Sequence, residues 1–160
     1  SDVYKRQGRI TVVARRHAGP GRALSAAHRM GLDIETLTWK PADSASNTEA
    51  ARRLAAADVV ISTLPAGAAD PLAGPTDAFT GRSGRTRSAA VMLDVVYAPW
   101  PTALAQAWGR AGGAVAPGWL MLLHQAVPQV QLMTGQQPDI EDMRAALRSA
   151  LTSTSASADD

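Results

Sequence analysis

The chain has 160 residues, 46% of them hydrophobic, which suits one domain with one buried core. With no cysteine, three histidines at no ligand spacing, a formal net charge of +2 and few aromatic residues, the composition argues against a disulfide framework, a metal site and a nucleic-acid partner. No apolar run is long enough to span a bilayer, and residues 1–9 include no hydrophobic segment for a secretion signal. We therefore expect a cytoplasmic location and no membrane partner.

The first part of the chain alternates short apolar runs with helical stretches. Residues 1–8 do not match the Ala- and Arg-rich style of the rest of the chain, and we interpret them as a foreign or truncated leader. Runs of β-branched and other apolar residues predict strands over 10–14, 33–39 and 58–64. The helices between them are predicted over 22–30 and from Asn47 or Thr48 through Ala57.

The second part repeats the pattern after a long interruption. Residues 65–88 are rich in Gly, Pro, Ser and Thr, which predicts a long loop with one helical turn near 77–79. Strands are then predicted over 89–97 and around Ala114 and Val115, and helices over 101–110, 119–134 and 140–151. The Ser/Ala/Asp-rich tail 152–160 is expected to be disordered.

Strands that alternate with helices at this spacing predict an α/β fold: a doubly wound parallel sheet, Rossmann-like, with its domain over 9–151. Ligands in such sheets bind outside the carboxyl ends of the strands. The glycine-rich phosphate turn that usually follows the first strand is not found, so the visible pattern starts at what would be the second strand. We therefore expect a sheet that is incomplete at its N-terminus.

Arginines follow the first visible strand. Arg15 and Arg16 come directly after it, and Arg22 follows at the start of the next helix. Arginine at this place suits the 2′-phosphate of NADP, because a guanidinium pairs with phosphate through two hydrogen bonds. The alternative is a solvated charge cluster in a loop.

Two further segments offer residues for a flat cofactor. Thr63 lies where a buried strand turns at Pro65 and Gly67, and a backbone without bulky side chains there can approach a ligand closely. Gly118, Met121 and Gln125 are spaced i, i+3, i+7 and share one stripe of a helix. The alternatives are an ordinary strand exit for the first segment and core packing with a boundary glutamine for the second.

The stretches Asp94–Thr102 and Gly118–Gln125, with Thr134, Gly135 and Pro138 after them, closely resemble the C-terminal motifs of shikimate dehydrogenases. The resemblance implies that Tyr97 and Gln125 contact the substrate. It also implies that Val95, Gly118 and Met121 contact the cofactor. Arg15 and Arg22 resemble the arginines of the family's N-R-T-x-x-R signature, although Ala14 and Arg16 replace its Asn and Thr and extra residues separate the two arginines.

The resemblance implies an NADP-dependent oxidoreductase that reduces 3-dehydroshikimate to shikimate with NADPH. The family's proton-transferring lysine and aspartate belong to an N-terminal substrate domain and are not found in this sequence, so no catalytic residue is assigned and the chain alone is expected to be inactive. Two alternatives stay open. One is a quinate/shikimate dehydrogenase, and the other is a regulatory or interaction module that keeps the sheet but performs no chemistry.

Overall fold

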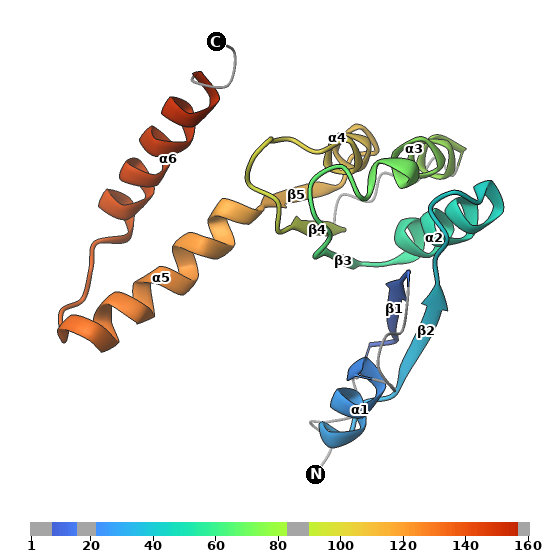
Figure 1. Cartoon of the computed structure of the whole chain (residues 1–160), viewed down its shortest axis with the longest axis horizontal. Helices are drawn as coiled ribbons and strands as arrows, with labels where there is room; N and C mark the ends of the chain where they lie inside the picture. The colour runs from blue at the N-terminus through green and yellow to red at the C-terminus, as the bar shows by residue number, and fades with distance from the viewer. Residues whose placement is uncertain (1–7, 16–21, 83–89, 157–160) are drawn as a thin grey trace.

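The computed structural model describes residues 8–15, 22–82 and 90–156 (Figure 1). The described elements alternate strand and helix, which confirms the predicted α/β class with parallel strands. They are β1 (Ile10–Ala14), α1 (Arg22–Arg29), β2 (Ile34–Thr38), α2 (Ser44–Ala56), β3 (Val59–Ser62), the 3₁₀ turn η1 (Asp70–Leu72), α3 (Ala73–Arg82), β4 (Val91–Asp94), α4 (Ala103–Arg110), β5 (Ala114–Pro117), α5 (Gly118–Thr134) and α6 (Ile140–Ala156).

The strands form two parallel sheets. β1 pairs with β2, and β3, β4 and β5 pair in that order. In a doubly wound sheet of the dinucleotide-binding type, one strand lies between two such groups. Among the described residues no strand joins β1 to β3, so the inner edges of both groups keep unpaired backbone groups.

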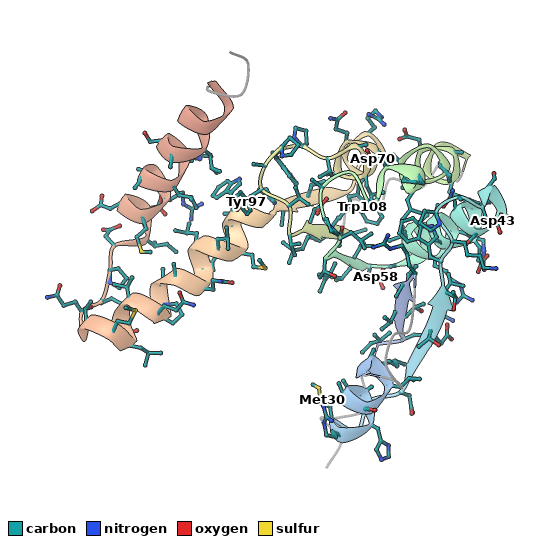
Figure 2. The ribbon with its side chains drawn as sticks, viewed as in Figure 1. Met30, Asp43, Asp58, Asp70, Tyr97 and Trp108 are labelled. Carbon is teal, nitrogen blue, oxygen red and sulfur yellow. The ribbon has the colours of Figure 1, made fainter. Side chains whose placement is uncertain are left out.

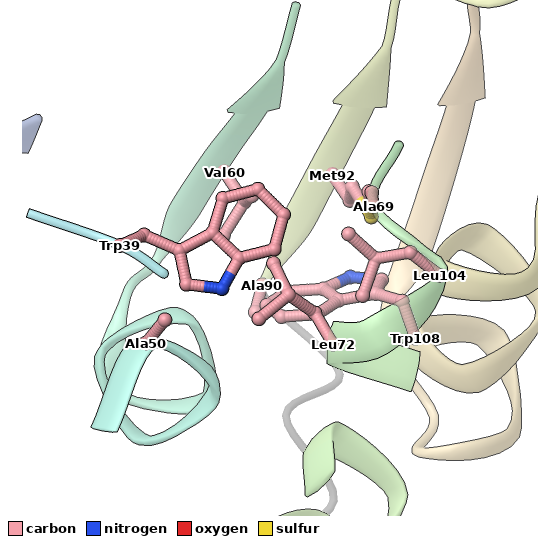
Figure 3. Packing of buried hydrophobic residues seen from close by; sticks show 9 residues of the cluster. All are labelled: Trp39, Ala50, Val60, Ala69, Leu72, Ala90, Met92, Leu104 and Trp108. Carbon is pink, nitrogen blue, oxygen red and sulfur yellow. The ribbon is translucent and has the colours of Figure 1, made fainter. Parts of the chain in front are cut away.

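The core lies on one face of the three-stranded sheet. Val60 and Met92 point into it from β3 and β4, and the alternation of a strand turns Val59 and Ile61 to the opposite face. Two tryptophans, each 2% exposed, are its largest side chains. Figure 3 shows Trp39 between α2 and β3, and Trp108 of α4 below β4 and β5. Trp39 follows β2, so it also joins the β1–β2 sheet to this core.

The start of α2 differs from the prediction. The helix begins at Ser44, because Asp43 takes the N-cap position and its Oδ1 accepts a hydrogen bond from the Ala45 N–H at 2.9 Å. Asn47, predicted as a cap, is instead buried inside the helix, where its Oδ1 accepts from the Trp39 indole N–H at 2.7 Å. Asn47 therefore accepts a hydrogen bond from the buried Trp39 and does not cap the helix.

The predicted loop 65–88 was wrong over much of its length. Residues 70–72 form η1 and residues 73–82 form α3, which packs between α2 and α4. Leu72 and Thr76 are buried in that packing. Tertiary contacts thus stabilise helical structure in a segment whose glycines and prolines disfavour it. Residues 83–89 lie outside the described part of the chain.

The two C-terminal helices were both predicted, but their observed bounds differ from the predicted ones. α5 runs unbroken from Gly118 to Thr134 with Pro128 inside it, and Gly135 ends it with a φ of 70°. α6 continues to Ala156, so residues 152–156 are helical and the predicted disordered tail starts too early. Residues 157–160 and 1–7, the latter nearly all of the predicted leader, lie outside the described residues.

Candidate functional site

The candidate site is the carboxyl edge of the β3–β4–β5 sheet. Ser62, Asp94 and Pro117 stand side by side in the parallel register at the ends of the three strands. The residues that follow them are Thr63, Val95 and Gly118, three of the predicted cofactor contacts. The register therefore brings these three positions to one edge of the sheet, the edge where ligands of parallel α/β sheets bind.

Val95 and Gly118 are held together by backbone contacts. The Val95 N–H donates to the Ser62 carbonyl at 3.0 Å, and the Gly118 N–H donates to the Val96 carbonyl at 3.4 Å. A Cβ atom at Gly118 would collide with the carbonyl group of Val95. Only glycine therefore lets α5 begin this close to the strand β4, and this packing requirement explains Gly118 before any ligand is considered.

The first turn of α5 lies at this edge. Pro117, its N-cap residue, supplies no side-chain hydrogen bond. The amides of a first helical turn lack partners within their helix, and the positive end of the helix dipole lies there. Gly118 is buried, Met121 one turn further is half-buried, and Gln125 one turn beyond that is exposed. The stripe predicted from the spacing thus runs outward from the sheet edge along α5.

Tyr97 lies in the loop between β4 and α4, which connects Asp94 to Ala103. Its side chain is 50% exposed. Figure 2 shows it in the region where α5 leaves the sheet. Thr63 is also exposed. The site therefore presents a phenol, a hydroxyl and a primary amide to solvent, groups that donate and accept hydrogen bonds.

A buried carboxylate that the sequence analysis did not single out organises this loop. Asp94 is 1% exposed, and its Oδ2 accepts a hydrogen bond from the Thr102 hydroxyl at 2.7 Å. Its Oδ1 accepts from the Val96 N–H at 3.2 Å. The signal was in the sequence, because Asp94 opens the first of the two motifs and Thr102 closes it, but that motif was interpreted only through Val95 and Tyr97.

Two of the three predicted arginines, Arg15 and Arg22, lie in the described part of the chain. Arg15 follows β1, in the other sheet, and is exposed. Arg22 opens α1, and Arg16 lies outside the described residues. Arg15 therefore stands at the carboxyl end of a strand, as predicted, and whether it acts together with Arg16 and Arg22 stays a prediction.

Within the described ranges, no three His, Asp or Glu side chains gather in a way that would hold a metal ion. The same ranges contain no helix with the length and apolar character needed to cross a membrane.

A family model, curated relatives and a solved structure all indicate the same family. The model of the Shikimate 5'-dehydrogenase C-terminal domain matches residues 118–148. Proteins named Shikimate dehydrogenase (NADP(+)) from Rubrobacter xylanophilus and Bacillus subtilis are 36% and 35% identical over 80% and 77% of this chain. The crystal structure of Mycobacterium tuberculosis shikimate dehydrogenase superposes with a TM-score of 0.68 at 37% identity, over 89% of this chain. The resemblance stated from the two motifs is thereby confirmed.

The matched relatives are much longer than this chain. It covers 42% of the two curated relatives and 46% of the mycobacterial structure. The chain thus spans less than half the length of the proteins it matches, in their C-terminal part.

Proposed function

We propose, because the chain belongs to the shikimate dehydrogenase family in its C-terminal part, that it forms the cofactor-binding part of an NADPH-dependent enzyme that reduces 3-dehydroshikimate to shikimate. The observation that carries the proposal is the junction of β4, the Tyr97 loop and α5. There Thr63, Val95 and Gly118 follow the ends of three neighbouring strands, and the family model matches from Gly118 onward.

The residues at this edge fit a nicotinamide. Gly118 presents backbone without a side chain, Val95 is apolar and half-buried, and Met121 offers a soft thioether one turn along α5. In the proposal these three residues form an apolar wall against one face of the ring. Arg15, at the end of β1, serves the 2′-phosphate at the far end of the cofactor.

Tyr97 and Gln125 serve the substrate. A polyhydroxylated ring needs partners that donate and accept hydrogen bonds, and both side chains reach solvent beside the proposed nicotinamide wall. Their part is to hold the carbonyl carbon in position for hydride transfer, which the bound cofactor supplies.

The proton that the product oxygen needs comes, in the proposal, from the lysine and aspartate of an N-terminal substrate domain such as the family has. Reduction of a ketone to an alcohol requires one hydride on carbon and one proton on oxygen. The described residues at the carboxyl edge include one carboxylate, Asp94, and it is buried and already bonded to Thr102. This chain is therefore assigned binding and orientation, and no proton transfer.

The test compares the chain alone with the chain joined to the N-terminal part of the Bacillus subtilis relative. NADP reduction is followed with shikimate and, separately, with quinate as substrate. We expect no turnover from the chain alone and shikimate-dependent turnover from the joined protein. Preference for quinate would favour the alternative substrate, and a joined protein that is folded but inactive would favour the non-catalytic module.

Within the joined enzyme, Gln125→Ala should lower kcat/KM for shikimate by roughly 10- to 100-fold, the effect of losing one or two hydrogen bonds, with an unchanged Kd for NADPH. Gln129→Ala is the matched control, since Gln129 lies one turn further along α5 and is equally exposed. If both variants have normal kinetics, Gln125 has no role in the substrate site.

A further inference from the structure

Asp94 is a buried carboxyl group at the point where β4 leaves the sheet. A carboxyl group that is 1% exposed needs hydrogen-bond partners for its oxygens, and each oxygen of Asp94 has one. Oδ1 accepts from the backbone of Val96, two residues on, and Oδ2 accepts from the Thr102 hydroxyl at 2.7 Å.

The bond to Thr102 connects the two ends of the loop that carries Tyr97. Asp94 is the last residue of β4, and Thr102 is the N-cap of α4, where its hydroxyl oxygen accepts from the Ala105 N–H at 3.1 Å. The loop is therefore tied to a strand at one end and to a helix at the other, and Asp94 bonds both to the loop and to the cap. Flexible segments gain fixed geometry when their ends are held together in this way.

The loop is also tied to the start of α5. Val96, whose N–H is bonded to Asp94, accepts with its carbonyl from the Gly118 N–H. The absence of a side chain at Gly118 allows this approach. A chain of contacts thus runs from Thr102 through Asp94 and Val96 to the first residue of α5.

We propose that Asp94, through its hydrogen bond to Thr102, is a positioning residue that fixes Val95 and Tyr97 against the start of α5. The inference rests on the proposed function, since it matters for catalysis only if Tyr97 contacts substrate and Val95 the cofactor. Asp94 itself touches neither ligand. Its effect is to order the loop before ligands arrive, so that less conformational freedom is lost on binding.

The competing explanation is that Thr102 only caps α4 and that the loop needs no tie to Asp94. Two variants separate the explanations. Thr102→Val removes the cap and the bond to Asp94 together, whereas Thr102→Asp keeps a good N-cap but replaces the donating hydroxyl by a second carboxyl group beside Asp94. Thr102→Ser keeps both functions and is the conservative control.

The experiment uses the full 160-residue chain with 3-fluorotyrosine in place of its two tyrosines, Tyr4 and Tyr97, and needs no substrate or cofactor. Tyr97→Phe assigns the ¹⁹F signals. Amide hydrogen exchange is measured at Val96 and Gly118 in the same variants. The Trp39 amide, which donates to the Ala14 carbonyl in the other sheet, is the reference for global unfolding.

For both Thr102→Val and Thr102→Asp we expect the Tyr97 signal to move toward that of free fluorotyrosine. Exchange at Val96 and Gly118 should rise about tenfold or more relative to Trp39, with Thr102→Ser unchanged. If Thr102→Asp behaves as the unsubstituted chain does, or if Tyr97 is unmoved in both variants, the proposal is overturned. Should Thr102→Val fail to fold, Thr102→Asp decides. Should Thr102→Asp fail to fold, Asp94→Ala takes its place, because it removes the bond to Thr102 and leaves the Thr102 cap of α4 intact. Because no ligand is present, a negative result here is distinct from a failure of the proposed activity.

Discussion

Arg15 is the residue on which cofactor choice depends in the proposed function. It stands exposed at the carboxyl end of β1, where a guanidinium can reach the phosphate that distinguishes NADPH from NADH. In the joined enzyme, Arg15→Ala should weaken NADPH binding by roughly 10- to 100-fold, the worth of a charge-assisted pair, and leave NADH binding nearly unchanged. Fluorescence titration of both cofactors measures the two Kd values.

The control for this prediction is Arg9→Ala. Arg9 is exposed like Arg15 but precedes β1, so it lies at the opposite end of the same strand. Its removal changes the net charge equally without affecting the carboxyl edge. Equal losses for NADPH and NADH in Arg15→Ala, or equal losses in both variants, would show that Arg15 acts as general positive charge only.

For single residues, the sequence predicted where a residue lies in the fold better than which side chain it forms a hydrogen bond with. Thr63, Val95 and Gly118 were each chosen from local pattern or resemblance, and the register places them at one edge. The bond between Asp94 and Thr102 was missed, because a buried carboxylate can be recognised only when its surroundings are known. Asn47 was misassigned for the same reason, since its partner Trp39 is outside the helix.

Among the elements, α2 carries a charge network on its outer side. Glu49 accepts hydrogen bonds from Arg52 at 2.6 Å and from Arg53 at 3.0 Å, and Arg53 also bonds Glu35 of β2 at 3.0 Å. Hydrogen bonds from Arg52 and then Arg53 lower the pKa of Glu49 from 4.5 to about 2. Because the folded pKa is depressed, any stabilisation is present above the ordinary pKa and is lost as pH falls through about 2.

We predict that carbon NMR titration of the Glu49 carboxyl gives a midpoint well below 4.5, and that Arg52→Gln/Arg53→Gln brings the midpoint back toward that value. Glu49 lies at the surface and is partly exposed, so solvent screens the pairs and the change in unfolding free energy should be small. Arg29→Gln, at the end of α1, is the control and should leave the midpoint as it was. A midpoint that stays near the ordinary value in the unsubstituted chain would mean that the arginines do not hold Glu49 in solution.

The elements also show where local pattern fails. Strands β1 to β5 were all found, since runs such as Val59–Ser62 are dense in β-branched residues and short. α3 was not found, because its sequence contains Gly74, Pro75 and Gly81 and its helicity depends on packing between α2 and α4. The alternation of strands and helices in the sequence therefore predicted the class of fold. The helix α3 could not be predicted from its own residues, because it depends on packing against α2 and α4.

For the molecule as a whole, the sheet of β3, β4 and β5 is covered unequally. Residues of α2 and α4, with Leu72 of η1, form the core beneath Val60 and Met92, and α3 packs between the two helices. On the other face Val59 is 65% and Ile61 62% exposed, and Val91, the register partner of Val59, is 39% exposed. In Figure 1 these three helices lie on the same side of the sheet, and α5 extends away from it. A doubly wound sheet has cover on both faces, so this apolar face is available for contact.

The last prediction concerns that open face. The double substitution Val59→Thr/Ile61→Thr should reduce binding of the dye ANS and slow concentration-dependent aggregation of the chain, because it removes exposed apolar surface beside the unpaired edge of β3. Threonine is β-branched and suits a strand, so the free energy of unfolding should change by no more than about 0.5 kcal/mol. Both quantities are measured on the same preparations, by ANS fluorescence and light scattering for the surface and by urea unfolding for stability.

Val60→Thr is the matched control for the double variant. Val60 lies between the two exposed positions on the same strand but is 6% exposed, so the same substitution buries a hydroxyl in the core and should destabilise the chain by about 1–3 kcal/mol. Val60→Thr leaves the exposed side chains of Val59 and Ile61 unaltered, so ANS binding and aggregation should not fall. If the double variant aggregates as the unsubstituted chain does, the Val59/Ile61 face is not the surface through which the chain associates. If Val60→Thr is as well tolerated as the double variant, the division of β3 into a core face and an open face is wrong.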